Sequence, residues 1–107
     1  MSQIAPVAVV TGVGPGTGAA ISRRFSLGGY KVAMLARTQE RLEALERQLS
    51  NAKGYPCDVT QESQVDSVID AVRRDLGIPR VLIHNAVGGA FGNFMEINPE
   101  YSIATFR

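Results

Sequence analysis

Residues 7–18 read Val-Ala-Val-Val-Thr-Gly-Val-Gly-Pro-Gly-Thr-Gly, an apolar run that leads directly into four glycines. The run Val7–Val10 is typical of a parallel strand that is covered on both faces. The glycines come where this strand would give way to a helix, and they leave the turn without side chains. Backbone N–H groups and the positive end of the helix dipole are then open to an anion, so the stretch predicts a dinucleotide diphosphate site.

Strands and helices are predicted to alternate through most of the chain. Their apolar residues recur either in short continuous runs or at helical spacing, as in the stripe Val65, Val68, Ile69, Val72 and Leu76. The predicted elements are, in order, a helix from about Gly16 to Leu27, a strand Lys31–Ala36, a helix capped by Thr38, a strand around Gly54–Cys57, a helix starting at Thr60, a strand Arg80–Asn85 and a last helix near Pro99.

This order predicts an α/β fold, a doubly wound parallel sheet of the Rossmann type with about four parallel strands and flanking helices. No linker divides the chain, so residues 1–107 are expected to form the N-terminal, cofactor-binding part of a single domain. The sheet is expected to be incomplete, with its fourth strand left as an exposed apolar edge. We therefore expect the isolated chain to be marginally stable, dimerised or prone to aggregate.

Composition excludes several classes of protein. The formal net charge of +1 gives no general attraction to nucleic acid or to an anionic membrane, and neither is an expected partner. Met1–Ser22 is uncharged but contains Pro6, Pro15 and four glycines, which rule out a membrane-spanning helix, and it lacks the basic start of a signal peptide. Cys57 is the only cysteine, which favours a reducing, cytoplasmic location. No metal site is predicted.

The glycine spacing identifies the kind of phosphate loop. A P-loop would need Lys and then Ser or Thr after a glycine, but Ala19 and Ala20 follow Gly18. The pattern Thr11-Gly12-x-x-x-Gly16-x-Gly18 instead resembles the Thr-Gly-x-x-x-Gly-x-Gly loop of the short-chain dehydrogenase/reductase family. The resemblance covers the whole chain but only the first half of the family's domain. It implies that the loop residues Gly12, Gly14, Pro15, Gly16, Thr17 and Gly18 bind the cofactor diphosphate and nearby ribose.

The resemblance also points to residues at the ends of the next two strands. In the family, the residue that closes the second strand selects the cofactor, and here it is Arg37, followed by Thr38. A guanidinium pairs with the 2′-phosphate of NADP, so NADP is favoured over NAD; a solvated charge at a helix start is the alternative interpretation of Arg37. Pro15 stands where the family often has a second basic residue. Asp58 and Val59 resemble the family's acidic-aliphatic pair, which contacts adenine; a carboxylate at a helix start is the alternative interpretation of Asp58.

The fourth strand ends in His84-Asn85-Ala86-Val87, where the family usually has Asn-Asn-Ala-Gly. The resemblance implies that Asn85, Ala86 and Val87 line the inner ribose. His84, the only histidine, lies on a predicted buried strand, so a hydrogen-bonded core residue is favoured over a catalytic one. Cys57 is expected to be a small buried apolar residue.

The family's catalytic Ser and Tyr-x-x-x-Lys pair lie after the fourth strand, and none of these 107 residues forms such a pair. The resemblance implies an NADP-dependent oxidoreductase that exchanges hydride with a small-molecule carbonyl or alcohol, and this chain alone is expected to be inactive. A non-catalytic module that binds or senses NADP(H) is the alternative, and a relic without a ligand is a third. Because family members commonly form dimers or tetramers, a homo-oligomer is also among the expected partners.

Overall fold

The computed structural model describes residues 5–12, 16–84 and 102–105. Strands and helices alternate as predicted as far as the fourth strand. The elements are β1 (Val7–Thr11), α1 (Thr17–Leu27), β2 (Lys31–Ala36), α2 (Gln39–Gln48), β3 (Ala52–Pro56), α3 (Glu62–Asp75), β4 (Pro79–His84) and β5 (Ser102–Thr105). The predicted strand and helix ranges agree with these bounds to within one or two residues up to β4.

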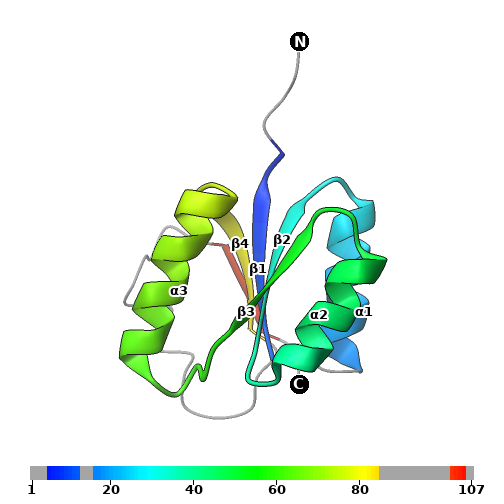
Figure 1. Ribbon diagram of the computed structural model, residues 1–107. Coiled ribbons are helices and arrows are strands. Elements are labelled where there is room, and N and C mark those ends of the chain that lie inside the picture. The colour runs from blue at the N-terminus through cyan, green and yellow to red at the C-terminus, as the bar shows by residue number, and fades with distance from the viewer. Residues whose placement is uncertain (1–4, 13–15, 85–101, 106–107) are drawn as a thin grey trace.

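The strands form one parallel sheet in the order β3-β2-β1-β4-β5. This order confirms the doubly wound α/β fold, because the chain moves outward from β1 in one direction and then returns to its other side. Parallel strands all present their carboxyl ends at the same edge, which lies toward the bottom of Figure 1, where the loops that follow β2 and β3 are seen. Residues just after the strands are therefore brought together there.

Helices cover both faces of the sheet, with α1 and α2 on one side and α3 on the other (Figure 1). Successive side chains of a strand point to opposite faces, so β1 divides its residues between two cores. Val7 and Val9 pack with residues of α3, and Ala8 and Val10 pack with residues of α1 and α2. The continuous apolar run Val7–Val10 is thus explained by burial on both faces of the sheet.

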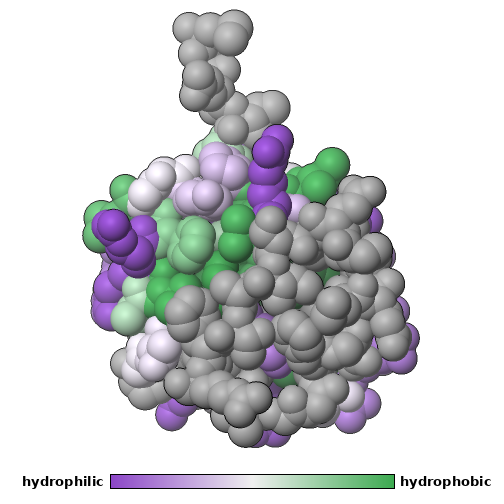
Figure 2. Space-filling view, turned by 180° about the vertical axis from the view of Figure 1, so that it is seen from behind, coloured by the Kyte–Doolittle hydropathy of each residue, from purple (hydrophilic) through white to green (hydrophobic). Residues whose placement is uncertain are grey.

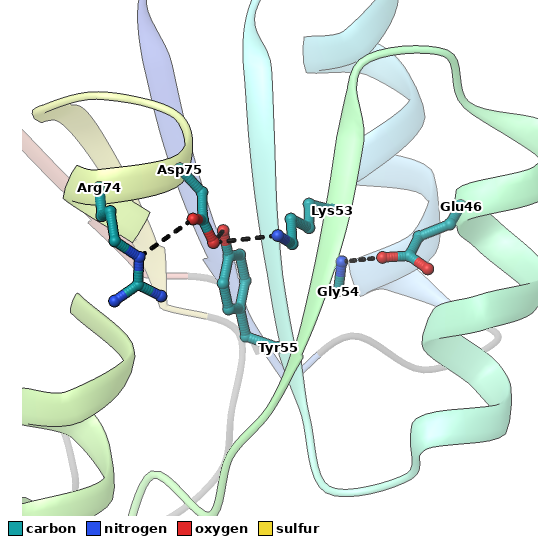
Figure 3. A network of polar contacts seen from close by, with 6 residues as sticks. All are labelled: Glu46, Lys53, Gly54, Tyr55, Arg74 and Asp75. Carbon is teal, nitrogen blue, oxygen red and sulfur yellow. Dashed lines mark hydrogen bonds and ion pairs between the residues drawn. The ribbon is translucent and has the colours of Figure 1, made fainter. Parts of the chain in front are cut away.

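The edge strand β3 is attached to a helix on each side (Figure 3). Asp75, the last residue of α3, accepts hydrogen bonds from Lys53 Nζ at 3.0 Å and from the Tyr55 hydroxyl at 3.1 Å. On the other side, a carboxylate oxygen of Glu46 in α2 accepts a hydrogen bond from Gly54 N at 2.6 Å. These contacts fix the position of β3 and of the residues that follow its carboxyl end.

Two helix starts differ in detail from the prediction. Thr38 occupies the N-cap position of α2, as predicted, but its side chain makes no capping hydrogen bond. The third helix begins at Glu62 with Gln61 as its N-cap, two residues later than the predicted start at Thr60. The reason is that the Thr60 hydroxyl is hydrogen-bonded to Asp58, a local side-chain contact that competes with a helical start.

The C-terminal part of the sheet also differs from the prediction. Residues 102–105, within the region where a last helix was expected, form a fifth parallel strand, and Val81 to His84 pair with Ser102 to Thr105. β4 is therefore an interior strand, not the exposed edge that was expected. The reason is that, without β5, the N–H and C=O groups on the edge of β4 away from β1 would have no partner. A segment that pairs with them satisfies the backbone groups of both strands. Residues 99–101 lie outside the described part.

The described surface carries few large exposed apolar side chains. Leu27, at the end of α1, and Ile78, just before β4, are both more than half exposed, and both lie at the amino edge of the sheet. Figure 2 shows hydrophobic surface among the described residues on the back of the molecule. In the part of the chain that the structure describes, no helix combines the length and the apolar character needed to cross a membrane.

Candidate cofactor site

Three predicted site residues lie at the carboxyl ends of three neighbouring strands. Gly12 follows β1, Arg37 follows β2, and Asp58 follows β3 after one intervening residue. Adjacent strands are about 4.8 Å apart, so these positions form a row across one half of the sheet edge. In open α/β sheets this carboxyl edge is where ligands bind.

The glycine loop starts and ends with exposed backbone. Gly12 has a φ of 68°, a left-handed conformation that favours glycine. Gly16 is the N-cap of α1 and is exposed, and a Cβ placed on it would meet no atom within 4 Å among the described residues other than its chain neighbours. Thr17 is exposed, whereas Gly18 is buried. Gly18 therefore packs within the fold, and Gly12, Gly16 and Thr17 are the described loop residues that are exposed to a ligand.

The N-terminus of α1 differs electrostatically from those of the other described helices. The first turn of α2 contains Glu40 and that of α3 contains Glu62, whereas the first turn of α1 contains no acidic residue. The first N–H groups of a helix have no partner within the helix, and the dipole makes this end positive. An incoming anion at α1 would thus meet donors without a competing carboxylate.

Arg37 and Thr38 are both exposed directly after β2. Because the Thr38 side chain makes no capping hydrogen bond, its hydroxyl is not committed to the N-terminus of α2. Together with hydrogen bonds from Thr60, the positive charge of Arg37 lowers the pKa of Asp58, which follows the carboxyl end of the neighbouring strand β3. Arg37 and Asp58 thus follow neighbouring strands and influence each other electrostatically.

Asp58 is held as a carboxylate by its surroundings. Its Oδ1 accepts hydrogen bonds from the Thr60 hydroxyl at 2.6 Å and from Thr60 N at 3.0 Å. These hydrogen bonds, together with the charge of Arg37, hold the pKa of the Asp58 carboxyl below its usual range. Sequence reasoning selected Asp58 but missed Thr60, although the Asp-x-Thr spacing is typical of such a local turn.

The neighbours of Asp58, Cys57 and Val59, are apolar, and they anchor the segment after β3 to the core. Cys57 is buried, as predicted, and burial raises the pKa of its thiol to about 11. Val59 is half-buried and packs against the core on the α3 face. Asp58 is therefore the polar member of this triplet, and the residues on both sides of it are packed against the core.

A buried polar pair joins β1 to β4 just below the glycine loop. Thr11 Oγ1 lies 3.0 Å from His84 Nδ1, in a hydrogen bond between the last residues of the two strands. Both side chains are buried, and burial lowers the pKa of the His84 imidazole. The prediction of a hydrogen-bonded core histidine is confirmed.

This burial gives stability a dependence on pH. The folded-state pKa of His84 lies below the unfolded value of about 6.5, so the folded protein takes up this proton less readily. Its contribution is fully present above pH 6.5 and is lost as the pH falls below that value. We expect the free energy of unfolding to fall by up to about 1.4 kcal/mol per pH unit between pH 6.5 and 5.5.

Urea unfolding at pH 7.5, 6.5 and 5.5 measures this slope. His84→Asn keeps a hydrogen-bonding side chain without a titrating group, and we expect it to flatten the slope. An equal slope in this variant would show that another group is responsible.

The remaining predicted residues, Gly14, Pro15, Asn85, Ala86 and Val87, lie outside the described residues. The structure therefore brings together the outer part of the predicted site, at the ends of β1, β2 and β3. The part assigned to the inner ribose stays a prediction.

Comparison with known proteins identifies the family. Residues 6–106 match the model of the short chain dehydrogenase family. The chain belongs to this family. A fatty acyl-CoA reductase of Acinetobacter baylyi is 36% identical over 84 residues, which are 75% of this chain and 28% of that protein. An uncharacterized oxidoreductase of Staphylococcus epidermidis is 32% identical over 95 residues, which are 88% of this chain and 41% of that protein.

A solved structure has a similar fold. The crystal structure of a Phe→Trp variant of actinorhodin polyketide ketoreductase with NADPH superposes with a TM-score of 0.76 at 32% identity. The match covers 82% of this chain and 36% of that chain. The short-chain dehydrogenase chain described here thus spans between about a quarter and two fifths of the length of these relatives.

Proposed function

We propose that residues 1–107 bind NADP(H) as the N-terminal cofactor part of a short-chain dehydrogenase domain. The observation that carries this proposal is the row of Gly12, Arg37 and Asp58 at the ends of three adjacent strands. The row offers a bare backbone, a guanidinium and a carboxylate in that order. A diphosphate, a 2′-phosphate and an adenine amino group occur in the same order along one half of NADP, and each group matches its position chemically.

In this proposal Gly12, Gly14, Pro15, Gly16 and Thr17 face the diphosphate, and the buried Gly18 completes the loop by letting α1 pack closely. Arg37 and Thr38 hold the 2′-phosphate, and Asp58 and Val59 receive the adenine. Asn85, Ala86 and Val87 line the inner ribose. Arg37 favours NADP over NAD because a guanidinium forms paired, charge-assisted hydrogen bonds with phosphate. The NADPH in the crystal structure of the polyketide ketoreductase supports this preference.

We further propose that a protein of the relatives' full length exchanges hydride between the nicotinamide and a small-molecule carbonyl or alcohol. Membership of the family supports this reaction. Within residues 1–107 none of the tyrosines, Tyr30, Tyr55 and Tyr101, is followed by a lysine four positions later. Hydride transfer is therefore assigned to a protein of the relatives' full length, and cofactor binding to residues 1–107.

Titration calorimetry of the chain with NADPH and with NADH tests the proposal. We expect saturable binding of NADPH, weaker binding of NADH, and a rise in melting temperature that grows with the NADPH concentration, because a ligand that binds the folded state stabilises it. Inorganic tripolyphosphate, which has no adenine, is at the same concentration the control for general attraction to phosphates. If NADPH produced no heat of binding and no rise in melting temperature, the proposal would be contradicted.

A further inference from the structure

The Asp58 carboxylate is held in one orientation by Thr60, a residue outside the predicted cofactor site. Both hydrogen bonds from Thr60 end on the same carboxylate oxygen, Oδ1, at 2.6 Å from the hydroxyl and 3.0 Å from the backbone nitrogen. In the part of the chain that the structure describes, Oδ2 accepts no hydrogen bond. The two oxygens are therefore distinguished, one held by the protein and the other available to a ligand.

The backbone of Asp58 is fixed as well. Asp58 N donates to Oε1 of Gln64, in the first turn of α3, at 2.8 Å, and Asp58 O accepts from Gln61 N at 2.9 Å. With the contacts to Oδ1, the main chain and the side chain of Asp58 are both tied to the segment that leads into α3. A carboxylate held in this way loses little conformational freedom when it accepts a further hydrogen bond.

We propose that Thr60 is a positioning residue that directs Oδ2 of Asp58 toward the exocyclic amino group of the bound purine, and so makes the site select adenine over a purine with an oxygen at that position. The inference rests on the proposed function. An amino group donates to Oδ2, whereas a carbonyl oxygen there faces a second acceptor, and two acceptors repel each other. A carboxylate free to rotate distinguishes the two bases less sharply.

Thr60→Val tests the inference, with NADPH and its hypoxanthine analogue as probes in titration calorimetry on the whole chain. We expect Thr60→Val to weaken NADPH binding about tenfold, the effect of one ordinary hydrogen bond that is no longer held in place. Binding of the hypoxanthine analogue is expected to change less than about twofold, because it makes no such bond. The preference for adenine therefore shrinks about tenfold.

Two further variants separate positioning from a general structural effect. Thr60→Ser keeps the hydroxyl and is expected to restore the preference for adenine. Ser63→Ala removes a hydroxyl from a neighbouring exposed position and is expected to change neither affinity. Thr60 is itself exposed, so Thr60→Val is expected to fold, and the melting temperature of each variant checks this.

The outcomes are distinct. An equal loss of affinity for both probes would show that Thr60 supports the loop without directing Oδ2, and would overturn the inference. Unchanged NADPH binding in Thr60→Val would overturn it too, while leaving the proposed function in place. Failure of the unaltered chain to bind NADPH would overturn the proposed function, and the inference with it.

Discussion

Replacing Arg37 by Asp is expected to lower the affinity for NADPH about a hundredfold and to change that for NADH by less than about threefold. Arg37 is exposed at the end of β2, and the proposal pairs its guanidinium with the 2′-phosphate. The substitution removes charge-assisted hydrogen bonds and places a like charge beside the phosphate. NADH lacks this phosphate, and a carboxylate can accept hydrogen bonds from its ribose hydroxyls.

Arg47→Asp provides the matched control. It changes the net charge by the same amount on an exposed residue, but Arg47 lies in the last turn of α2, at the far end of that helix from Arg37. We expect this variant to bind both cofactors nearly as well as the unaltered chain. Calorimetric dissociation constants for NADPH and NADH give the ratio that decides the matter. The same NADPH-to-NADH ratio in Arg37→Asp and Arg47→Asp would remove Arg37 from the site.

The Arg37→Asp variant also has a readout that needs no ligand. The positive charge of Arg37 helps to hold the pKa of the Asp58 carboxyl low, after the hydrogen bonds from Thr60. Reversing the charge at position 37 is therefore expected to raise that pKa, which a carbon-13 NMR titration of the Asp58 carboxyl measures. This change would confirm that the ends of β2 and β3 form one electrostatic unit before any cofactor binds.

The parts of the fold that follow from local pattern were predictable. Val7–Val10 is apolar without interruption because β1 is central and covered on both faces, and the stripe from Val65 to Leu76 marks the buried side of α3. Gly12 was predictable for a related reason, since its positive φ expresses a backbone requirement that shows in residue type. Each of these features leaves its mark in the residue types of one short segment.

The parts that were missed depend on partners distant in sequence or on competition between local contacts. Ser102–Thr105 is too short for its periodicity to distinguish a strand from a helix, and it is a strand because the edge of β4 is there to pair with it. Thr60 was expected to start a helix, but Asp58 already binds its hydroxyl.

In the candidate site, too, single residues follow from local sequence, whereas their contacts depend on partners distant in the sequence. Arg37 and Asp58 were selected one by one from the resemblance to the family's pattern after the second and third strands, but their mutual electrostatic influence depends on β2 and β3 being neighbours in the sheet. The Thr11–His84 pair likewise needs β1 beside β4. Sequence therefore identifies the groups that can contact a ligand, and topology decides which of them act together.

Substitutions at Gly12 test the diphosphate loop directly, with a matched pair that differs only in charge. At a φ of 68°, Asn and Asp are tolerated better than other residues, so Gly12→Asn and Gly12→Asp are each expected to cost about 1 kcal/mol of stability. Gly12→Asn is expected to weaken NADPH binding about tenfold, because a side chain now stands where the backbone meets the diphosphate. Gly12→Asp is expected to weaken it at least about a further tenfold, through repulsion of the diphosphate.

Folding and binding separate in this pair because the introduced negative charge acts on them in opposite directions. An introduced carboxylate near the N-terminus of α1, whose first turn has no acidic residue, interacts favourably with the positive end of the helix when no ligand is bound. Gly12→Asp is therefore expected to unfold in urea at a concentration equal to or above that for Gly12→Asn, although it binds NADPH more weakly. Equal NADPH affinities in the two variants would place the diphosphate elsewhere, because a phosphate held at this loop has to sense the added charge.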